Sequence, residues 1–388
     1  MEKVKLCELA DIYLGVTHTP EYVFNGVPFL SVKDISGGEI RFDDCKYISQ
    51  KEYDSLSEGA KPKVGDMLFC RVGTLGKPII IPEGTPLFGS FVSLGYLRNK
   101  NADRCDLNYL RYWMYSNSFW KQVNSNVKGA SQINLNTGWL SKFDIDLPDM
   151  QEQKYRISVL DKCKVIIEQR EEELKVLDDL IRARFVEMFG DENNSKNWDV
   201  VNVEEVADVQ VGVVIKPSQY YTDKSEGVRA FRSLNIGAGF IKDIDWVYFT
   251  KEGHQKNSKS ILKKNDLLIV RSGAPGTACV VTEEYAGCNA VDIIIAHPDC
   301  RKVNPYYLCT FTNMPHGKKQ INEGIGGAAQ QHFNVGKYNK LQLMLPPKAL
   351  QDEFVGFVKQ VDKSKVEVQK ALDKTQMLFD SLMQQYFG

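Results

Sequence analysis

Two long stretches of this 388-residue chain carry apolar residues on an alternating spacing of three and four, with polar residues between them. The first stretch runs from Gln151 to Met188 without a glycine or proline, and the second follows Pro346–Pro347. This spacing is typical of coiled-coil helices, and each helix would be roughly 55–60 Å long. The predicted seam residues are Ile157, Leu160, Ile167, Leu174, Ile181 and Phe185 in the first stretch, and Phe354, Val361, Val368, Leu372, Phe379 and Leu382 in the second.

Each predicted helix has one apolar stripe to bury, and the other helix is the obvious partner. We expect the two to pair antiparallel. Parallel pairing would bring the regions that precede the helices to the same end, where they would compete for space. A polar linker over residues 191–197 joins the first helix to the second half of the chain.

The regions ahead of the two helices show a different pattern. Short apolar runs between turn signals, such as Met67–Cys70 and Leu267–Val270, predict strands. Longer stretches, Leu107–Val123 and Pro305–Ile321, predict helices. This alternation predicts an α+β globule in each half.

The two halves follow one plan, in the same order and at an offset near 200 residues. The matching pairs include 4–11 with 201–208, Asp66/Arg71/Gly73/Gly76 with Asp266/Arg271/Gly273/Gly276, Gly129/Gln132/Asn136 with Gly327/Gln330/Asn334, Leu147–Pro148 with Leu345–Pro346, and Phe189–Gly190 with Phe387–Gly388. Such an internal repeat predicts a pseudo-two-fold arrangement. DNA and symmetric assemblies are recognised with the same two-fold logic.

Composition sets limits on the function. With 43% hydrophobic and 26% charged residues the chain is ordinary for a globular protein, and a net charge of −1 argues mildly against a surface coated in nucleic acid. One local basic stretch, residues 251–264, is read either as a DNA contact or as a solvated loop. No apolar run suits a membrane span and the N-terminal residues lack the apolar core of a signal peptide, so we expect a cytoplasmic protein. Nine scattered cysteines and five dispersed histidines indicate reduced thiols and no metal site.

Motifs that would indicate catalysis are incomplete. Asn304-Pro305-Tyr306-Tyr307 looks like the amine-holding motif of amino-methyltransferases, but it lacks the second proline and no S-adenosylmethionine loop precedes it. Asp149 with Glu152-Gln153-Lys154 has the letters of a nuclease metal site, but the spacing at a helix entry favours capping. We therefore assign no catalytic residue.

Two repeated elements are the candidates for ligand contact. The first is the turn after Arg71 and Arg271, where glycines let the backbone approach a phosphate and arginine can contact phosphate or guanine. Its structural alternative is a buried Arg–Asp pair that stabilises the turn. The second is the loop over residues 129–136 and 327–334, whose Gln and Asn side chains could read adenine or bridge phosphates. Its alternative is a polar loop that satisfies its own backbone.

On these motifs the chain resembles the specificity subunit of a Type I restriction–modification system, over essentially its full length. The resemblance implies target recognition domains at 1–150 and 191–347, and spacer helices at 151–190 and 348–388. It implies that each globule reads half of a bipartite, asymmetric DNA site, while the antiparallel helices set the spacing and dock methyltransferase subunits. The globules differ between their shared motifs; the segment 31–35 holds Lys33, for example, and its counterpart 233–236 has no lysine. The candidate DNA-contacting residues are Lys33, Arg71, Gly73, Ser131, Gln132, Asn136, Lys259, Arg271, Gly273, Gln330, Gln331 and Asn334.

The expected partners are double-stranded DNA, two copies of a methyltransferase subunit and, in a restricting system, translocase subunits. No cofactor is assigned to this chain, because S-adenosylmethionine, Mg²⁺ and ATP belong to the partners in the family it resembles. Two other functions stay open: a self-sufficient DNA methyltransferase or nuclease, and a scaffold that does not bind DNA.

Overall fold

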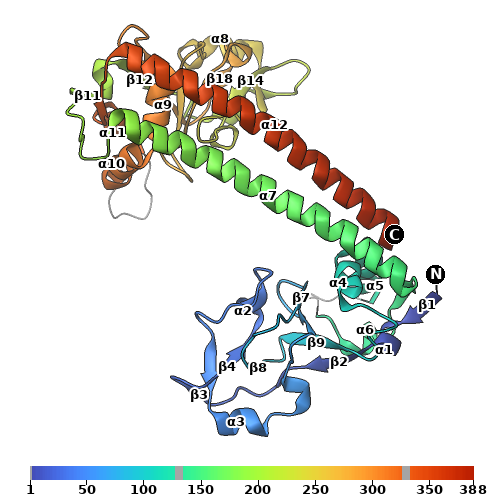
Figure 1. The fold of residues 1–388 in the computed structure, drawn as a ribbon. Helices are drawn as coiled ribbons and strands as arrows, with labels where there is room; N and C mark the ends of the chain where they lie inside the picture. Colours follow the sequence, from blue (N-terminus) through green and yellow to red (C-terminus); the bar gives the residue numbers. More distant parts are fainter. Residues whose placement is uncertain (1, 127–133, 326–332) are drawn as a thin grey trace. The chain divides into compact units, whose positions relative to one another are not determined.

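The computed structural model describes residues 2–126, 134–325 and 333–388. The chain forms two compact units, and both take part of each long helix. Unit 1 comprises Met1–Glu171 and Lys370–Gly388, and unit 2 comprises Glu172–Gln369. Figure 1 shows the two long helices, α7 (Met150–Phe189) and α12 (Lys348–Phe387), as continuous elements.

Unit 1 is built on two small sheets and a two-stranded ribbon. The strands of the first sheet follow the order β2 (Ala10–Leu14), β9 (Leu94–Asn99), β6 (Met67–Cys70) and β7 (Gly76–Ile80). Those of the second follow the order β3 (Tyr22–Val23), β5 (Lys46–Ile48), β4 (Val27–Leu30) and β8 (Gly89–Ser90). The ribbon consists of β1 (Glu2–Lys5) and β10 (Asp144–Leu147). The shorter helices are α1 (Leu6–Leu9), α2 (Val32–Ile35), α3 (Gln50–Ser55), α4 (Leu107–Tyr115), α5 (Asn117–Asn126) and α6 (Thr137–Leu140). All four residues of β6 are buried, which explains their continuous apolar run.

Unit 2 repeats this plan strand for strand. The strands of its first sheet follow the order β12 (Ala207–Val211), β19 (Ile293–Pro298), β16 (Leu267–Val270) and β17 (Ala278–Val280). Those of its second sheet follow the order β13 (Tyr221–Thr222), β15 (Val247–Phe249), β14 (Val228–Phe231) and β18 (Asn289–Ala290). Its ribbon consists of β11 (Val200–Asn202) and β20 (Gln342–Met344). Its shorter helices are α8 (Lys251–Lys256), α9 (Pro305–Asn313), α10 (Pro315–Ile325) and α11 (Val335–Asn339). The doubled α+β fold predicted from the sequence is confirmed.

Each predicted helical stretch within the globules is in fact two helices. Leu107–Val123 is divided at Ser116, whose hydroxyl accepts a hydrogen bond from the Phe119 amide at 3.3 Å. The second stretch is divided at Met314, because Pro315 follows and has no amide hydrogen to continue the first helix.

A buried glutamine fastens the start of each long helix to its globule. The Gln153 side chain accepts from the Asp106 amide at 2.9 Å and donates to the carbonyls of Arg104 and Pro148, both at 2.9 Å. Gln351 makes the same three contacts in unit 2, with Asn304, Lys302 and Pro346. Both glutamines are fully buried, so these bonds form away from water, where an unmade bond is costly.

The far end of each long helix closes the other repeat's globule. In unit 1 the ring centroid of Phe387, at the end of α12, lies 4.9 Å from the ring centroid of Tyr109. In unit 2 the ring centroid of Phe189, at the end of α7, lies 4.9 Å from the ring centroid of Tyr307. Within each unit the start of one long helix therefore meets the end of the other, which is the antiparallel pairing that we predicted.

The seam residues at the ends of the helices are buried with the globules. Ile157 and Leu160 belong to the core of unit 1, and Phe185 and Phe354 to the core of unit 2. Val361 and Val368 are also buried. The other predicted seam positions are half-buried: Ile167, Leu174, Ile181, Leu372, Phe379 and Leu382.

Candidate nucleic-acid interface

The repeated arginine in unit 1 stands where β6 ends and a glycine turn begins. Gly73 and Gly76 have φ values of 68° and 77°, a left-handed conformation that glycine adopts without steric cost. A Cβ at Gly273 would meet nothing within 4 Å, and at Gly73 only Val32 would lie as near as 4.0 Å, so the backbone angle alone requires glycine at these two positions. A Cβ at Gly276 would lie 2.4 Å from Ile321, so close packing also requires glycine there. The turn is thus a preformed, exposed loop behind a rigid strand.

The Arg71 guanidinium is occupied by main-chain carbonyls. Its Nε donates to the Leu135 carbonyl at 3.0 Å and its Nη1 to the Val92 carbonyl at 2.8 Å. The Leu135 amide in turn donates to the Arg71 carbonyl at 3.0 Å. Burial lowers the pKa of Arg71 from its usual value. Arg71 therefore ties the returning end of the 129–136 loop to the glycine turn, and the two elements singled out in the sequence lie together.

Arg271 does the same work in unit 2 with one different partner. Its Nε donates to the Phe333 carbonyl at 3.3 Å, and the Phe333 amide donates back to the Arg271 carbonyl at 3.1 Å. Its Nη1, however, forms an ion pair with the carboxylate of Asp292. We call the two hydrogen bonds between the arginine and the loop the loop anchor. Both units share the loop anchor, whereas the second partner of the guanidinium differs between them.

The repeated aspartate has a separate structural role. Asp66 forms an ion pair with Arg98, at 2.9 Å from Nε and 2.7 Å from Nη2, and accepts from the Lys63 amide at 2.7 Å. This pairing raises the pKa of Arg98. In unit 2, Asp266 bonds the His297 ring at 2.6 Å instead. The aspartates are therefore not the partners of Arg71 and Arg271, and the structural alternative is wrong on this point. Asp66 instead pairs with Arg98, and Asp266 with His297, each on the neighbouring strand.

The two candidate asparagines cap short helices. Asn136 Oδ1 accepts from the Gly138 amide at 2.8 Å at the start of α6, and Asn334 Oδ1 accepts from the Lys337 amide at 3.0 Å at the start of α11. Each fixes the point where the loop rejoins the globule. Ser131, Gln132, Gln330 and Gln331 lie outside the described residues.

The remaining candidates are exposed lysines and one glycine. Lys33, in α2, donates through Nζ to the Asp44 carbonyl at 2.6 Å. Lys259 is exposed, and its carbonyl accepts from Gln210 Nε2 at 2.7 Å. Gly273 has a φ of 85° and occupies the position of Gly73.

Sequence reasoning missed Asp292, which belongs to the second arginine site. A signal was present: the first repeat has six residues in Gly89–Leu94, and the second has only five in Asn289–Ile293. This one-residue difference becomes visible once the strands that flank it are aligned.

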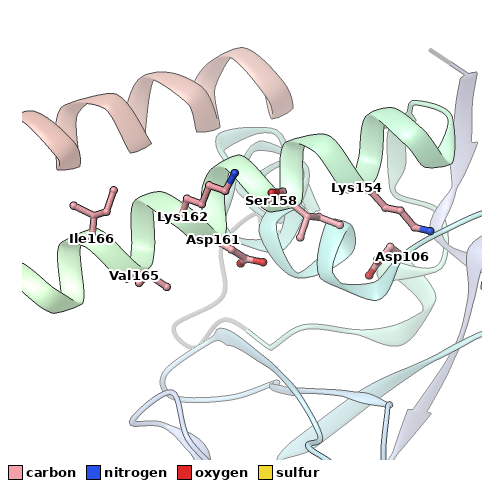
Figure 2. Close-up of a pocket in the computed structure, with 8 residues that line it drawn as sticks. Asp106, Lys154, Ser158, Asp161, Lys162, Val165 and Ile166 are labelled. Atoms are coloured by element: carbon pink, nitrogen blue, oxygen red, sulfur yellow. The ribbon is translucent and has the colours of Figure 1, made fainter.

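A separate hollow lies against α7 in unit 1. Its volume is about 590 Å³, and all its lining residues except Asp106 come from that helix (Figure 2). Val165 and Ile166, at one end, are 49% and 41% exposed. Exposed apolar residues beside a hollow are suited to protein contact.

Among the described residues, no group of His, Cys, Asp and Glu has the arrangement of a metal site. Within that part of the chain, no helix combines the length and apolar character that a bilayer crossing needs.

The sequence profile described as the Type I restriction modification DNA specificity domain matches residues 1–176 and again residues 195–375. The chain belongs to this family of specificity subunits. The double match agrees with the two repeats, each with its arginine turn and loop anchor.

Individual relatives are distant in sequence. The MjaVIII Type I restriction enzyme specificity subunit of Methanocaldococcus jannaschii is 23% identical over 193 residues, which are 46% of this chain and 42% of that relative. The match thus spans less than half of the curated relative.

Two solved structures resemble this specificity subunit over its whole length. The S subunit of a Type I restriction-modification system from M. genitalium superposes with a TM-score of 0.59 at 14% identity, covering 100% of this chain and 96% of the other. A chain from a study of complex assembly and conformational transition of the type I R-M system gives a TM-score of 0.62 at 15% identity, covering 100% and 97%. At these identities the likeness establishes the shared fold.

Proposed function

We propose that this specificity subunit reads a bipartite, asymmetric DNA site, one half with each repeat, and itself catalyses no reaction. The observation that carries this proposal is the duplicated anchor: Arg71 and Arg271 each join a glycine turn to a polar loop on a rigid strand. Two such surfaces in one chain suit two half-sites on one duplex. A turn rich in main-chain amides and a loop rich in Gln and Asn have the chemistry to bind phosphates and base edges.

The half-sites are expected to differ in sequence. The loop anchor is common to both units, but the groups around it are not, since Arg71 meets a carbonyl where Arg271 meets the Asp292 carboxylate. Lys33 of unit 1 has no lysine at the matching place in unit 2. Shared anchors position a reading surface, and the varied neighbours decide which bases it prefers.

We further infer that the paired helices set the distance between the half-sites and dock two methyltransferase subunits. Restriction or translocase subunits would join the same complex. S-adenosylmethionine, Mg²⁺ and ATP would be bound by those partners. Support comes from the hollow on α7 with exposed Val165 and Ile166, which a partner side chain could fill.

The direct test is to map DNA modification. The chain is co-expressed with its methyltransferase subunit in a host without modification, and methylated bases are located by long-read sequencing. We expect a split, asymmetric motif that appears only when this chain is present. Equal methylation with the methyltransferase alone would contradict the proposal and favour a scaffold.

An exchange of residues 1–150 for those of another specificity subunit sharpens that test. We expect one half of the motif to change and the other half to stay. A change in both halves, or in neither, would contradict the assignment of one half-site to each repeat.

The docking proposal has a matched pair of variants. Ile166→Glu places a charge beside the hollow on α7, and Ser364→Glu places the same charge at the corresponding position of α12, where the native residue is already polar. We expect Ile166→Glu to weaken binding of one methyltransferase copy by about ten-fold, near 1.4 kcal/mol, and Ser364→Glu to have little effect. Native mass spectrometry of the complex measures both. Full binding of both methyltransferase copies by the Ile166→Glu variant would remove α7 from the docking surface.

A further inference from the structure

Unit 2 lacks one residue at the edge of the arginine site, and this changes what the site presents. In unit 1, Phe91 forms an isolated bridge to Val16, and Val92 and Ser93 lead from it to β9. In unit 2 the corresponding bridge is Val213 to Val291, and Asp292 alone leads to β19. The connection between the bridge and the next strand therefore has one residue in unit 2 and two residues in unit 1.

The shortened connection gives Asp292 an unusual backbone. Its φ is 50°, in the left-handed region that few residues other than glycine adopt, although aspartate tolerates it better than most. In this conformation its side chain reaches Arg271 Nη1. In unit 1 the equivalent guanidinium position is filled by the Val92 carbonyl at 2.8 Å, so no side chain is presented there.

The carboxylate remains accessible while it is held. The Asp292 side chain is 46% exposed and that of Arg271 is 16% exposed. A carboxylate oxygen has several acceptor sites, so one bond to Arg271 leaves capacity for a second donor. The arginine thus orients an acceptor toward solvent at the edge of the site.

Two exposed apolar residues, Val214 and Ile215, lie next to Asp292, and we call them the apolar tip. The Asp292 amide donates to the Val213 carbonyl at 3.1 Å, and the two residues after Val213 are exposed, Val214 by 47% and Ile215 by 82%. Lys216, which follows, is also left-handed, with a φ of 43°. The acid and the apolar tip therefore share one edge of unit 2.

Neither group is suited to the phosphate backbone of DNA. A carboxylate is repelled by phosphates, and Val or Ile side chains gain little from them. In the major groove, by contrast, Asp accepts a hydrogen bond from the cytosine N4 amino group, and apolar side chains contact the thymine methyl group. The pair of features points to base edges.

We propose that Asp292, oriented by Arg271, selects a cytosine amino group in the half-site read by unit 2. This inference rests on the proposed function, since it requires that unit 2 reads DNA. Unit 1 has no equivalent selection, because a main-chain carbonyl occupies that position. Arg271 acts here as a positioning residue.

The test is Asp292→Asn in the full complex with its methyltransferase subunits, with modification mapped by long-read sequencing. Asparagine keeps an oxygen for Arg271 but replaces the outer acceptor with an amino donor. We expect one position of one half-site to lose its preference for cytosine by about ten-fold, with the other half-site unchanged. Asp223→Asn, an exposed acid of the same unit, is the matched control and should leave the motif intact.

An unchanged motif with Asp292→Asn overturns the inference while leaving the proposed function in place. A wild-type complex that yields no split motif contradicts the proposed function itself, so the two failures are distinguishable. Should the variant fold poorly, as judged by thermal melting, the wild-type complex supplies the second measurement. Competitor duplexes in which each C·G pair of that half-site is exchanged for T·A should include one that competes about ten-fold less well, and the absence of any such pair overturns the inference.

Discussion

Arg71 and Arg271 hold the same place in the two repeats, yet they differ in what they bind. Both donate Nε to a loop carbonyl, and the main-chain carbonyl of each accepts a hydrogen bond from the amide of that same loop residue. Only Arg271 adds a carboxylate, because unit 2 is one residue shorter beside it. The contact between the arginine and the loop thus stays constant, while a difference of one residue in backbone length changes the group that the guanidinium meets.

The two closing phenylalanines provide the largest expected effect. Phe189 is fully buried and Phe387 is 8% exposed, and each packs on a buried tyrosine. Phe189→Ala should lower the free energy of unfolding of unit 2 by about 3–5 kcal/mol, and Phe387→Ala should lower that of unit 1 by somewhat less, because a cavity replaces the ring. Hydrogen exchange of β16 and β6 measures the two units separately. Equal loss of protection in both strands for either variant would show that the units do not respond independently.

The buried glutamines test how closely the repeats match. Gln153→Leu or Gln351→Leu leaves one amide and two carbonyls without their partner, which should cost about 1–3 kcal/mol in each unit. Denaturant unfolding of the two variants should give similar values. A much smaller loss in one unit would mean that water or a rearranged side chain replaces the glutamine there.

Conservative replacement of the arginines probes the anchor itself. Lysine lacks the forked geometry, so Arg71→Lys and Arg271→Lys should each lose about one hydrogen bond, near 1 kcal/mol, and weaken DNA binding about five-fold at one half-site. Arg71→Lys loses a bond to a neutral carbonyl, whereas Arg271→Lys keeps its charge near Asp292. The effects of the two variants are separated by measuring how the methyltransferase complex binds duplexes in which either one half-site or the other is altered. Full affinity in both variants would restrict the arginines to a structural role.

Acid pH should remove a stabilising interaction of Asp299 in unit 2 that has no counterpart at the matching position of unit 1, and this is the smallest effect. Hydrogen bonds from Arg301 lower the pKa of Asp299 to about 2, below its ordinary value of 3.8, and unit 1 has the neutral Asn101 at the matching position. Because the folded pKa is depressed, this stabilisation is present above the ordinary pKa and is lost as pH falls through about 2. Hydrogen exchange near β19, measured from pH 4 downward, should show the loss, and Asp299→Asn should remove it. An identical profile in the variant would assign the pH dependence to other groups.

Much of the fold was predictable because the repeat makes each signal appear twice. The strand runs at Met67 and Leu267 and the long seams were legible from apolar spacing alone. The breaks at Ser116 and Met314 were less evident, since one depends on a hydroxyl cap that many serines never make. Asn304-Pro305-Tyr306-Tyr307 illustrates how a motif misleads: Asn304 caps α9, and Tyr307 is a core residue.

The candidate site was predictable in outline only. The sequence indicated the arginine turn and the Gln/Asn loop, but their contact joins residues more than sixty positions apart, and a main-chain carbonyl leaves no trace in side-chain identity. The true partners of Asp66 and Asp266, an arginine and a histidine, are likewise set by strand pairing. Asp292 was missed because its importance comes from a deletion.

The closing of unit 1 by Phe387 has a consequence for synthesis on the ribosome. Unit 1 is assembled from two segments of the chain, and the whole of unit 2 is translated between them. Residues 1–171 therefore lack the segment that covers Tyr109 until Phe379–Phe387 emerges from the ribosome. Unit 2, which is continuous in sequence, has no such delay and is free to fold first, although its codons come later.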